Sequence, residues 1–160
     1  MKKVSFIGTG LMGFPMASNL LKAGIKLKVF NRSINKAEPL KEFGAEISNT
    51  LSSVVKDTDF IITMLTDDSA VEAIMGHPDF LNNLNSGSTV IDMSSIKPNT
   101  AIKYGNILKS KDINYLDAPV SGGTIGAEEG SLAIMVGGEQ RVFDNSKSIL
   151  KAMGNPTLVG

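Results

Sequence analysis

Three glycines near the amino terminus have the spacing of a phosphate-binding turn. Gly8, Gly10 and Gly13 fit the pattern G-x-G-x-x-G. The first permits a tight turn, the second lets the backbone approach a pyrophosphate, and the third lets a helix pack closely on a strand. Free N–H groups and the dipole at the helix start would hold the phosphate charge. The cofactor residues that this turn predicts are Gly8, Thr9, Gly10, Leu11, Met12 and Gly13.

A second group of polar side chains follows about one helix length later, in the sequence "VFNRS". A site for NAD usually has an Asp or Glu here, which accepts hydrogen bonds from the adenosine ribose. An acid would repel the 2′-phosphate of NADP, whereas an Arg accommodates it. Arg32 can offer a planar fork to that phosphate, and Asn31 and Ser33 can donate hydrogen bonds to it. We therefore expect NADP as the cofactor, with NAD as the second choice.

A third candidate site lies in the glycine-rich stretch 117–138, "DAPVSGGTIGAEEGSLAIMVGG". So many glycines beside Pro119 argue against one plain helix. Successive backbone N–H groups in such a loop can form a nest for an anion such as a carboxylate, and Ser121 adds a hydroxyl group. The alternative is a mobile loop that only caps the sheet.

The hydrophobic pattern around these sites predicts strands that alternate with helices. Short apolar runs predict strands at 3–7, 25–30, 60–65, 89–93, 113–116, 131–136 and 157–159. Helical periodicity predicts helices at 11–23, 33–43, 98–109 and 140–153. Ser33 would cap the second of these helices and Gly44 would end it. We expect one α/β domain over 1–160, a Rossmann-type, doubly wound and mostly parallel sheet with helices on both faces.

The composition argues against several classes of function. Sixteen basic and sixteen acidic residues give a formal net charge of zero, which disfavours binding of nucleic acid or a membrane surface through bulk charge. The sequence has no cysteine, and His77 is its only histidine, so Cys-type and multi-His metal sites are excluded. We interpret His77 as an exposed structural residue. Asp67 and Asp68 fit capping of a helix better than a metal pair. We expect a soluble cytoplasmic protein without a metal.

Several stretches together resemble the β-hydroxyacid dehydrogenase family, which includes 3-hydroxyisobutyrate dehydrogenase, tartronate semialdehyde reductase and glyoxylate/succinic semialdehyde reductase. They are "FIGTGLMGFPMASNLLKAG", "VFNRS", "ITML", "IDMSS" and the stretch 117–138. The resemblance covers essentially the whole chain, and the long glycine-rich motif is its most specific part. It implies an oxidoreductase that transfers hydride between NADP(H) and a small 3-hydroxy acid or semialdehyde.

The resemblance also implies roles for individual residues. Further cofactor residues would be Met64 and Leu65, beside the riboses, and Ser95, at the nicotinamide. The substrate carboxylate and hydroxyl would be bound by Ser121, Gly122 and Gly123, and Ser121 would orient the substrate for catalysis. Thr66 departs from the family, many members of which have Pro after "ML", and this would loosen the following loop.

The catalytic lysine of the family lies in a motif "G-x-G-x-x-x-K-x-x-x-N", at the start of a second, all-helical domain. The sequence stops at "MGNPTLVG", before that motif would begin, and no lysine in it fits. Lys97, Lys147 and Lys151 are interpreted as surface residues. A general acid or base must reach the reacting oxygen, so we expect this chain to bind cofactor and to turn over little or nothing. A full-length enzyme would be a homo-oligomer.

Two alternatives stay open. A relative of 6-phosphogluconate dehydrogenase would share the "SGG" loop and the "NR" phosphate site, although the loop spacing fits the hydroxyacid group better; imine reductases share the fold but usually lack this loop. The alternative from another class is a non-catalytic module that binds NADP or another protein.

Overall fold

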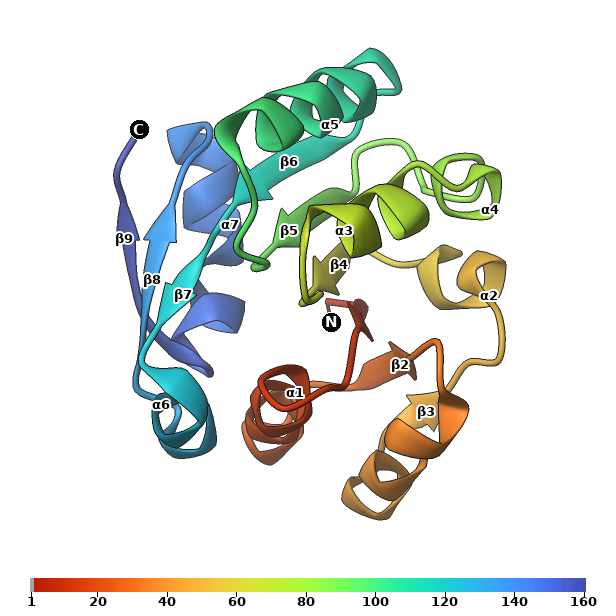
Figure 1. Cartoon of the computed structure of the whole chain (residues 1–160), viewed down its shortest axis with the longest axis vertical. Helices are drawn as coiled ribbons and strands as arrows, with labels where there is room; N and C mark the ends of the chain where they lie inside the picture. Colours follow the sequence, from red (N-terminus) through yellow and green to blue (C-terminus); the bar gives the residue numbers. More distant parts are fainter. Residues whose placement is uncertain (1) are drawn as a thin grey trace.

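The computed structural model describes residues 2–160 and contains a six-stranded parallel sheet. The strand order is β3-β2-β1-β4-β5-β6, so the chain runs outward from β1 in one direction and then crosses to the other side (Figure 1). The strands are β1 (Val4–Ile7), β2 (Leu27–Phe30), β3 (Glu46–Ile47), β4 (Phe60–Thr63), β5 (Thr89–Asp92) and β6 (Asn114–Asp117). This is the doubly wound α/β arrangement that the alternating pattern predicts.

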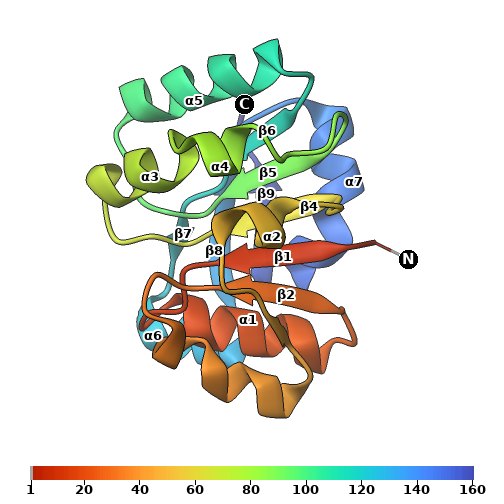
Figure 2. The same ribbon diagram turned by 90° about the vertical axis from the view of Figure 1, so that its right-hand side faces the viewer.

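Helices cover both faces of this sheet, and each face has its own hydrophobic core. Neighbouring strand residues point to opposite faces, so Phe6 packs in one core and Ile7 in the other. The first core includes side chains of α1 (Gly13–Lys22) and α7 (Gln140–Lys151). The second is covered by α2 (Leu51–Val55), α3 (Asp68–Met75), α4 (Pro78–Leu81) and α5 (Pro98–Ser110), as Figure 2 shows. No helix in residues 2–160 is long and apolar enough to cross a bilayer.

The last three strands form a second sheet, which corrects the expectation of a single one. The strands β7 (Val120–Ser121), β8 (Leu132–Val136) and β9 (Gly154–Leu158) have the order β7-β8-β9, and β7 runs antiparallel to β8. Side chains of β8 alternate between buried and exposed positions, whereas β4 and β5 are buried throughout. The alternation shows that β8 is buried on one face, so the second sheet is covered on a single face.

The segment 33–43 is not the helix that its pattern predicts. It forms two short 3₁₀ helices, η1 (Ile34–Lys36) and η2 (Glu38–Phe43). Pro39 explains the break, because its ring lacks the N–H that a continuous α-helix needs. Ser33 stands at the N-cap position of η1 but makes no side-chain capping bond. Gly44 ends η2, as predicted, and its backbone is left-handed (φ +98°).

Candidate functional site

A cavity of about 580 Å³ lies against the loops that follow β1, β2, β4 and β5. In doubly wound sheets this is where ligands bind, because the strand order reverses there. Its lining residues are Gly8, Gly10, Leu11, Met12, Gly13, Asn31, Arg32, Ser33, Lys36, Met64, Leu65, Thr66, Ala70 and Ser95. The structure therefore gathers at one place every predicted cofactor residue except Thr9.

Two glycines of the turn are required by the protein itself. Gly8 has a left-handed backbone (φ +103°), and a Cβ there would lie 2.1 Å from the carbonyl oxygen of Met64. A Cβ at Gly13 would lie 1.8 Å from the carbonyl oxygen of Gly8. Side chains at these two positions would therefore push the backbone segments apart. The helix α1 begins at Gly13 rather than at Leu11, where the sequence predicted its start.

Gly10 differs from both, and its surroundings test whether a dinucleotide fits. A Cβ at Gly10 would meet no atom within 4 Å, and its backbone is not left-handed. No contact within residues 2–160 therefore requires a glycine at this exposed position. A phosphate group approaching the backbone would require one. The first turn of α1 contains no acidic residue and has no side-chain cap, so its N–H groups suit an anion.

The side chain of Asn31 ties the glycine turn to the end of β2. Its Oδ1 accepts a hydrogen bond from the backbone N–H of Thr9 (2.9 Å), and its Nδ2 donates to the carbonyl of Ser33 (2.8 Å). Asn31 thus keeps only one amide hydrogen for a phosphate, so it mainly shapes the cavity. Thr9 itself is buried, and its Oγ1 has no hydrogen-bond partner.

The charges around this cavity are all positive. Arg32 and Lys36 are exposed on its rim, and no Asp or Glu in the described part of the chain lines it. Sequence analysis missed Lys36; a second cation four positions after Arg32 was the available signal. An NAD site usually has an Asp or Glu that accepts hydrogen bonds from the adenosine ribose, and none of the residues that line this cavity carries a carboxylate.

Hydrogen bonds from buried side chains join the ends of β4 and β5 behind the cavity. Met64 and Leu65 follow β4, which ends at Thr63, two residues earlier than predicted. The N–H of Leu65 donates to Ser94 Oγ (2.8 Å). Asp92 Oδ1 accepts from Thr63 Oγ1 (2.9 Å) and from the N–H of Ser94 (3.1 Å). The predicted residue Ser95 is exposed and lines the cavity, whereas sequence analysis missed its buried neighbour Ser94.

The two acids that follow the cavity loop have structural roles. Asp67 caps α3 by accepting from the N–H of Ala70 (2.8 Å), which confirms the capping interpretation for Asp67 but not for Asp68. Asp68 instead accepts from Thr100 Oγ1 (2.7 Å) and from the N–H of Lys97 (3.0 Å) at the start of α5. Both hydrogen bonds lower the pKa of Asp68, and the bond from Thr100 has the larger effect. No group of three or more His, Cys, Asp or Glu side chains that could hold a metal occurs in residues 2–160.

The remaining side chains that sequence analysis considered lie away from the cavity. His77 caps α4, its Nδ1 accepting from the N–H of Asp79 (3.0 Å), and its side chain is half-exposed. Lys97, Lys147 and Lys151 are exposed, as expected for surface residues.

The predicted substrate residues do not line the cavity. Ser121 ends β7 and is exposed, and Gly122 and Gly123 have left-handed backbones (φ +139° and +62°) that favour glycine. The stretch also contains a short helix, α6 (Gly123–Glu129), which the number of glycines did not suggest. Asn19 Nδ2 of α1 donates to the carbonyl of Ala127 (2.7 Å) and so holds α6 against α1.

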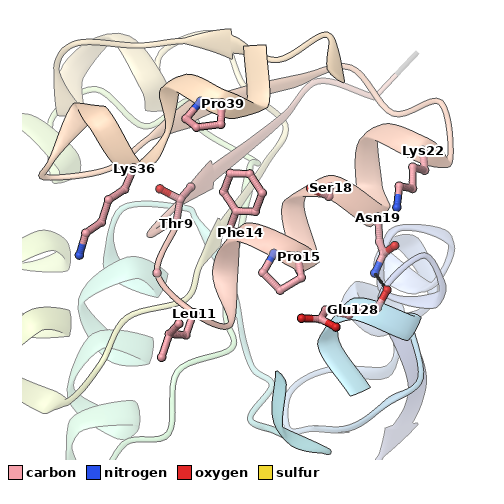
Figure 3. Close-up of a pocket in the computed structure, with 11 residues that line it drawn as sticks. Thr9, Leu11, Phe14, Pro15, Ser18, Asn19, Lys22, Lys36, Pro39 and Glu128 are labelled. Atoms are coloured by element: carbon pink, nitrogen blue, oxygen red, sulfur yellow. Dashed lines mark hydrogen bonds between the residues drawn. The ribbon is translucent and has the colours of Figure 1, made fainter. Parts of the chain in front are cut away.

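A second hollow of about 650 Å³ runs along α1 (Figure 3). Its residues are Thr9, Gly10, Leu11, Phe14, Pro15, Ser18, Asn19, Lys22, Lys36, Pro39 and Glu128. It shares Gly10, Leu11 and Lys36 with the cavity described above. Of the two, only that cavity contains all three glycines of the turn together with residues that follow β4 and β5.

Residues 3–160 match the family described as the NAD binding domain of 6-phosphogluconate dehydrogenase. The chain belongs to this family. A family described as an NAD binding domain agrees with a cavity that lies beside the glycine turn.

Several characterised proteins are similar to the chain. The 2-hydroxy-3-oxopropionate reductase of Escherichia coli is 41% identical over 160 residues, which cover 99% of this chain and 54% of the reductase. The Mycobacterium tuberculosis 3-hydroxyisobutyrate dehydrogenase, solved with L-serine, superposes with a TM-score of 0.93 at 30% identity, covering 99% of this chain and 54% of that one. Psf3, solved with NADP+ and 2-OPP, has the same TM-score and identity, covering 98% and 56%.

The chain spans about half the length of the curated relatives that it matches. Their similarity to residues 3–160 agrees with the resemblance found in the sequence, since these relatives are oxidoreductases.

Proposed function

We propose that the cavity binds NADP(H) in preference to NAD(H). The observation that carries this proposal is the rim of the cavity, where Arg32 and Lys36 lie beside the glycine turn and no carboxylate is present. A 2′-phosphate would be attracted by the two cations, and a free ribose would find no acidic acceptor. The NADP+ bound in Psf3 supports this choice by similarity.

Within such a complex each part of the cavity would have a separate task. The first turn of α1 would hold the pyrophosphate, and Arg32 and Ser33 would hold the 2′-phosphate. The side of the cavity formed by Leu65 and Ser95, called here the Leu65–Ser95 wall, would hold the nicotinamide half. When bound, the cofactor would give or accept the hydride. The protein would position it and exclude water from one face.

We further propose that the chain is the cofactor domain of a reductase or dehydrogenase for a small 3-hydroxy acid or semialdehyde. The names of its relatives support this substrate class. Ser121, Gly122 and Gly123 would bind the substrate carboxylate and hydroxyl. The proton would be moved by a lysine that residues 1–160 do not contain, so this chain alone would bind cofactor without turning over substrate.

Calorimetric titration with NADPH and, separately, NADH tests the cofactor preference. We expect NADPH to bind at least tenfold more tightly. Arg32→Ala should weaken NADPH binding by about ten- to a hundredfold, because a charge-assisted hydrogen bond contributes roughly 1.5–3 kcal/mol. Lys36→Ala should weaken it less, since an ammonium acts as a hydrated point charge. NADH binding should change by less than about twofold in both variants, because NADH lacks the phosphate.

Lys41→Ala is the matched control, because Lys41 is an exposed cation of η2 outside the cavity. It should leave both affinities unchanged. Equal binding of the two cofactors, or an Arg32→Ala variant that binds NADPH like the parent chain, would contradict the assignment of NADP.

A further inference from the structure

Two carboxyl groups, one fully and one partly buried, occupy neighbouring register positions where β5 and β6 end. Asp92 and Asp117 are register partners in this parallel pair, so their side chains project from the same face at neighbouring positions. Asp92 is fully buried and Asp117 is partly buried. Asp92 Oδ2 and Asp117 Oδ1 are both buried atoms without a hydrogen-bond partner. Native structures rarely leave such atoms unsatisfied, so the pair requires an explanation.

The groups around the pair offer no positive charge. Neither carboxyl forms an ion pair within residues 2–160. α3 contributes the acid Asp68, and β6 contributes Tyr115, whose hydroxyl is also buried without a partner. A hollow of about 370 Å³ beside Asp117 is lined by Tyr115 and by uncharged residues of α5 (Pro98, Ala101, Ile102, Gly105 and Asn106). A neighbouring cation therefore does not balance two negative charges here.

One proton shared by Asp92 and Asp117 would supply the hydrogen bond that their two unpartnered oxygens lack. Two adjacent carboxylates in a buried site cannot both ionise at ordinary cost, whereas a protonated carboxyl donates a hydrogen bond that its ionised neighbour accepts. Both unpartnered oxygens would then be satisfied. Burial and the charge of Asp92 raise the pKa of Asp117 to about 6, and burial raises the pKa of Asp92.

The same pair supports the wall of the cofactor cavity. Asp92 Oδ1 accepts hydrogen bonds from the N–H of Ser94 and from the hydroxyl of Thr63. Ser94 Oγ in turn accepts a hydrogen bond from the N–H of Leu65. Leu65 and Ser95 line the cavity. Asp117 is fixed from the other side, because its backbone N–H and carbonyl both bond to Gly137 (3.0 and 2.7 Å).

We propose that Asp92 and Asp117 share one proton, and that Asp92 in this pair is the positioning residue for the Leu65–Ser95 wall of the cofactor cavity. The inference rests on the proposed function, since it assigns cofactor binding to that wall. Loss of the shared proton places two negative charges together, separates the ends of β5 and β6, and withdraws Ser94 from Leu65. Cofactor binding therefore weakens as the pH rises past the pKa of the pair.

Titration of NADP+ between pH 5.5 and 8 with four variants tests the inference. An amide introduced by Asp92→Asn keeps the Oδ1 acceptor and supplies a permanent donor to Asp117. This variant should therefore bind NADP+ at every pH as tightly as the parent chain binds it at low pH. Because the parent's binding weakens as the pH rises, the ratio of the parent's Kd to the variant's Kd should rise on the order of tenfold between pH 5.5 and 8. Asp92→Ala should bind at least about tenfold more weakly at every pH, because both donors lose their acceptor.

Asp117→Asn should flatten the profile as Asp92→Asn does. Asp144→Asn, which removes an exposed charge from α7, should keep the parent's profile. Since each comparison uses the same ligand at the same pH, titration of the cofactor's own phosphate cancels. Equal behaviour of Asp92→Asn and Asp92→Ala, or a Kd ratio independent of pH, would overturn the inference while leaving the proposed function intact.

Thermal unfolding without cofactor tests separately the raised pKa of Asp117 that proton sharing requires. A folded-state pKa raised from 3.8 to about 6 means that the folded chain binds more protons between about pH 4 and 6. The parent's stability should therefore fall as the pH rises through this window, and Asp117→Asn should remove that fall. A parent profile identical to that of Asp117→Asn would overturn proton sharing. A parent chain that binds neither NADP+ nor NAD+ at any pH would overturn the positioning role together with the proposed function.

Discussion

At the scale of single residues, the three glycines of the turn show that one motif contains two kinds of constraint. Gly8 and Gly13 are fixed by protein atoms, because a Cβ at either would overlap a backbone carbonyl. Gly10 has open space around its missing side chain. The fold therefore explains Gly8 and Gly13 but not Gly10, and under the proposed function Gly10 leaves room for the phosphates of the cofactor.

Alanine substitutions should separate these constraints. Gly13→Ala should lower the free energy of unfolding by on the order of 3 kcal/mol, because the added methyl overlaps the Gly8 carbonyl. Gly10→Ala should change it by less than about 0.5 kcal/mol and weaken NADP+ binding about tenfold or more, because the methyl occupies the phosphate's place. Urea denaturation and calorimetry measure the two effects. A destabilised Gly10→Ala chain with normal affinity would contradict this division.

At the scale of elements, the short helix α6 of the glycine-rich stretch is held by contacts with α1. α6 has seven residues, too few to be stable alone. Asn19 binds the carbonyls of Ala127 and Glu128 at its end (2.7 and 3.4 Å), and Gly130 follows in a left-handed conformation. Of the predicted substrate residues, Ser121 is held by the pairing of β7 with β8, whereas Gly122 and Gly123 lead into the helix that Asn19 holds against α1.

Removal of the Asn19 amide should loosen this segment selectively. Asn19→Ala should cost about 1 kcal/mol of stability, the usual contribution of a hydrogen bond. Amide hydrogen exchange should accelerate in residues 123–129 and stay unchanged in α5. Asn106→Ala, on the exposed face of α5, is the control and should alter neither region. Unchanged exchange in 123–129 would show that α6 does not depend on Asn19.

Elements with a strong period were predictable from the sequence, and those set by tertiary contacts were not. The buried strands β1, β4 and β5 follow from continuous apolar runs. The segment 33–43 has a helical pattern, yet Pro39 divides it into 3₁₀ turns. The separate sheet was missed because the sequence shows the apolar residues of β8 but not which partner covers them.

Some residues of the candidate site were likewise predictable from the sequence, and others depend on tertiary contacts. The turn at 8–13 and Arg32 carry their chemistry in residue type and spacing, so sequence analysis found them. The amide of Asn31 and the hydroxyl of Ser94 act through hydrogen bonds to backbone groups distant in the chain, and spacing gives no sign of these. The partnership of Asp92 and Asp117 depends on strand register, which only the fold provides.

At the scale of the whole molecule, two hydrophobic cores hold a parallel sheet whose carboxyl ends form one cavity. Both cores pack against the central strands β1, β4 and β5, so the loops after these strands have rigid bases. Function is thereby placed on loops and stability on the layers beneath them. The central claim of the proposed function is that the cofactor binds at the strand ends and not in the second hollow along α1.

Amide chemical shifts of the ¹⁵N-labelled chain during titration with NADP+ test this claim most directly. We predict that the perturbed amides are those of 8, 10–13, 31–33, 64–66 and 95, because these residues line the cavity. Shifts centred on 14–22 and on Glu128 would place the ligand in the second hollow and contradict the account. An unchanged spectrum at millimolar NADP+ would contradict it as well.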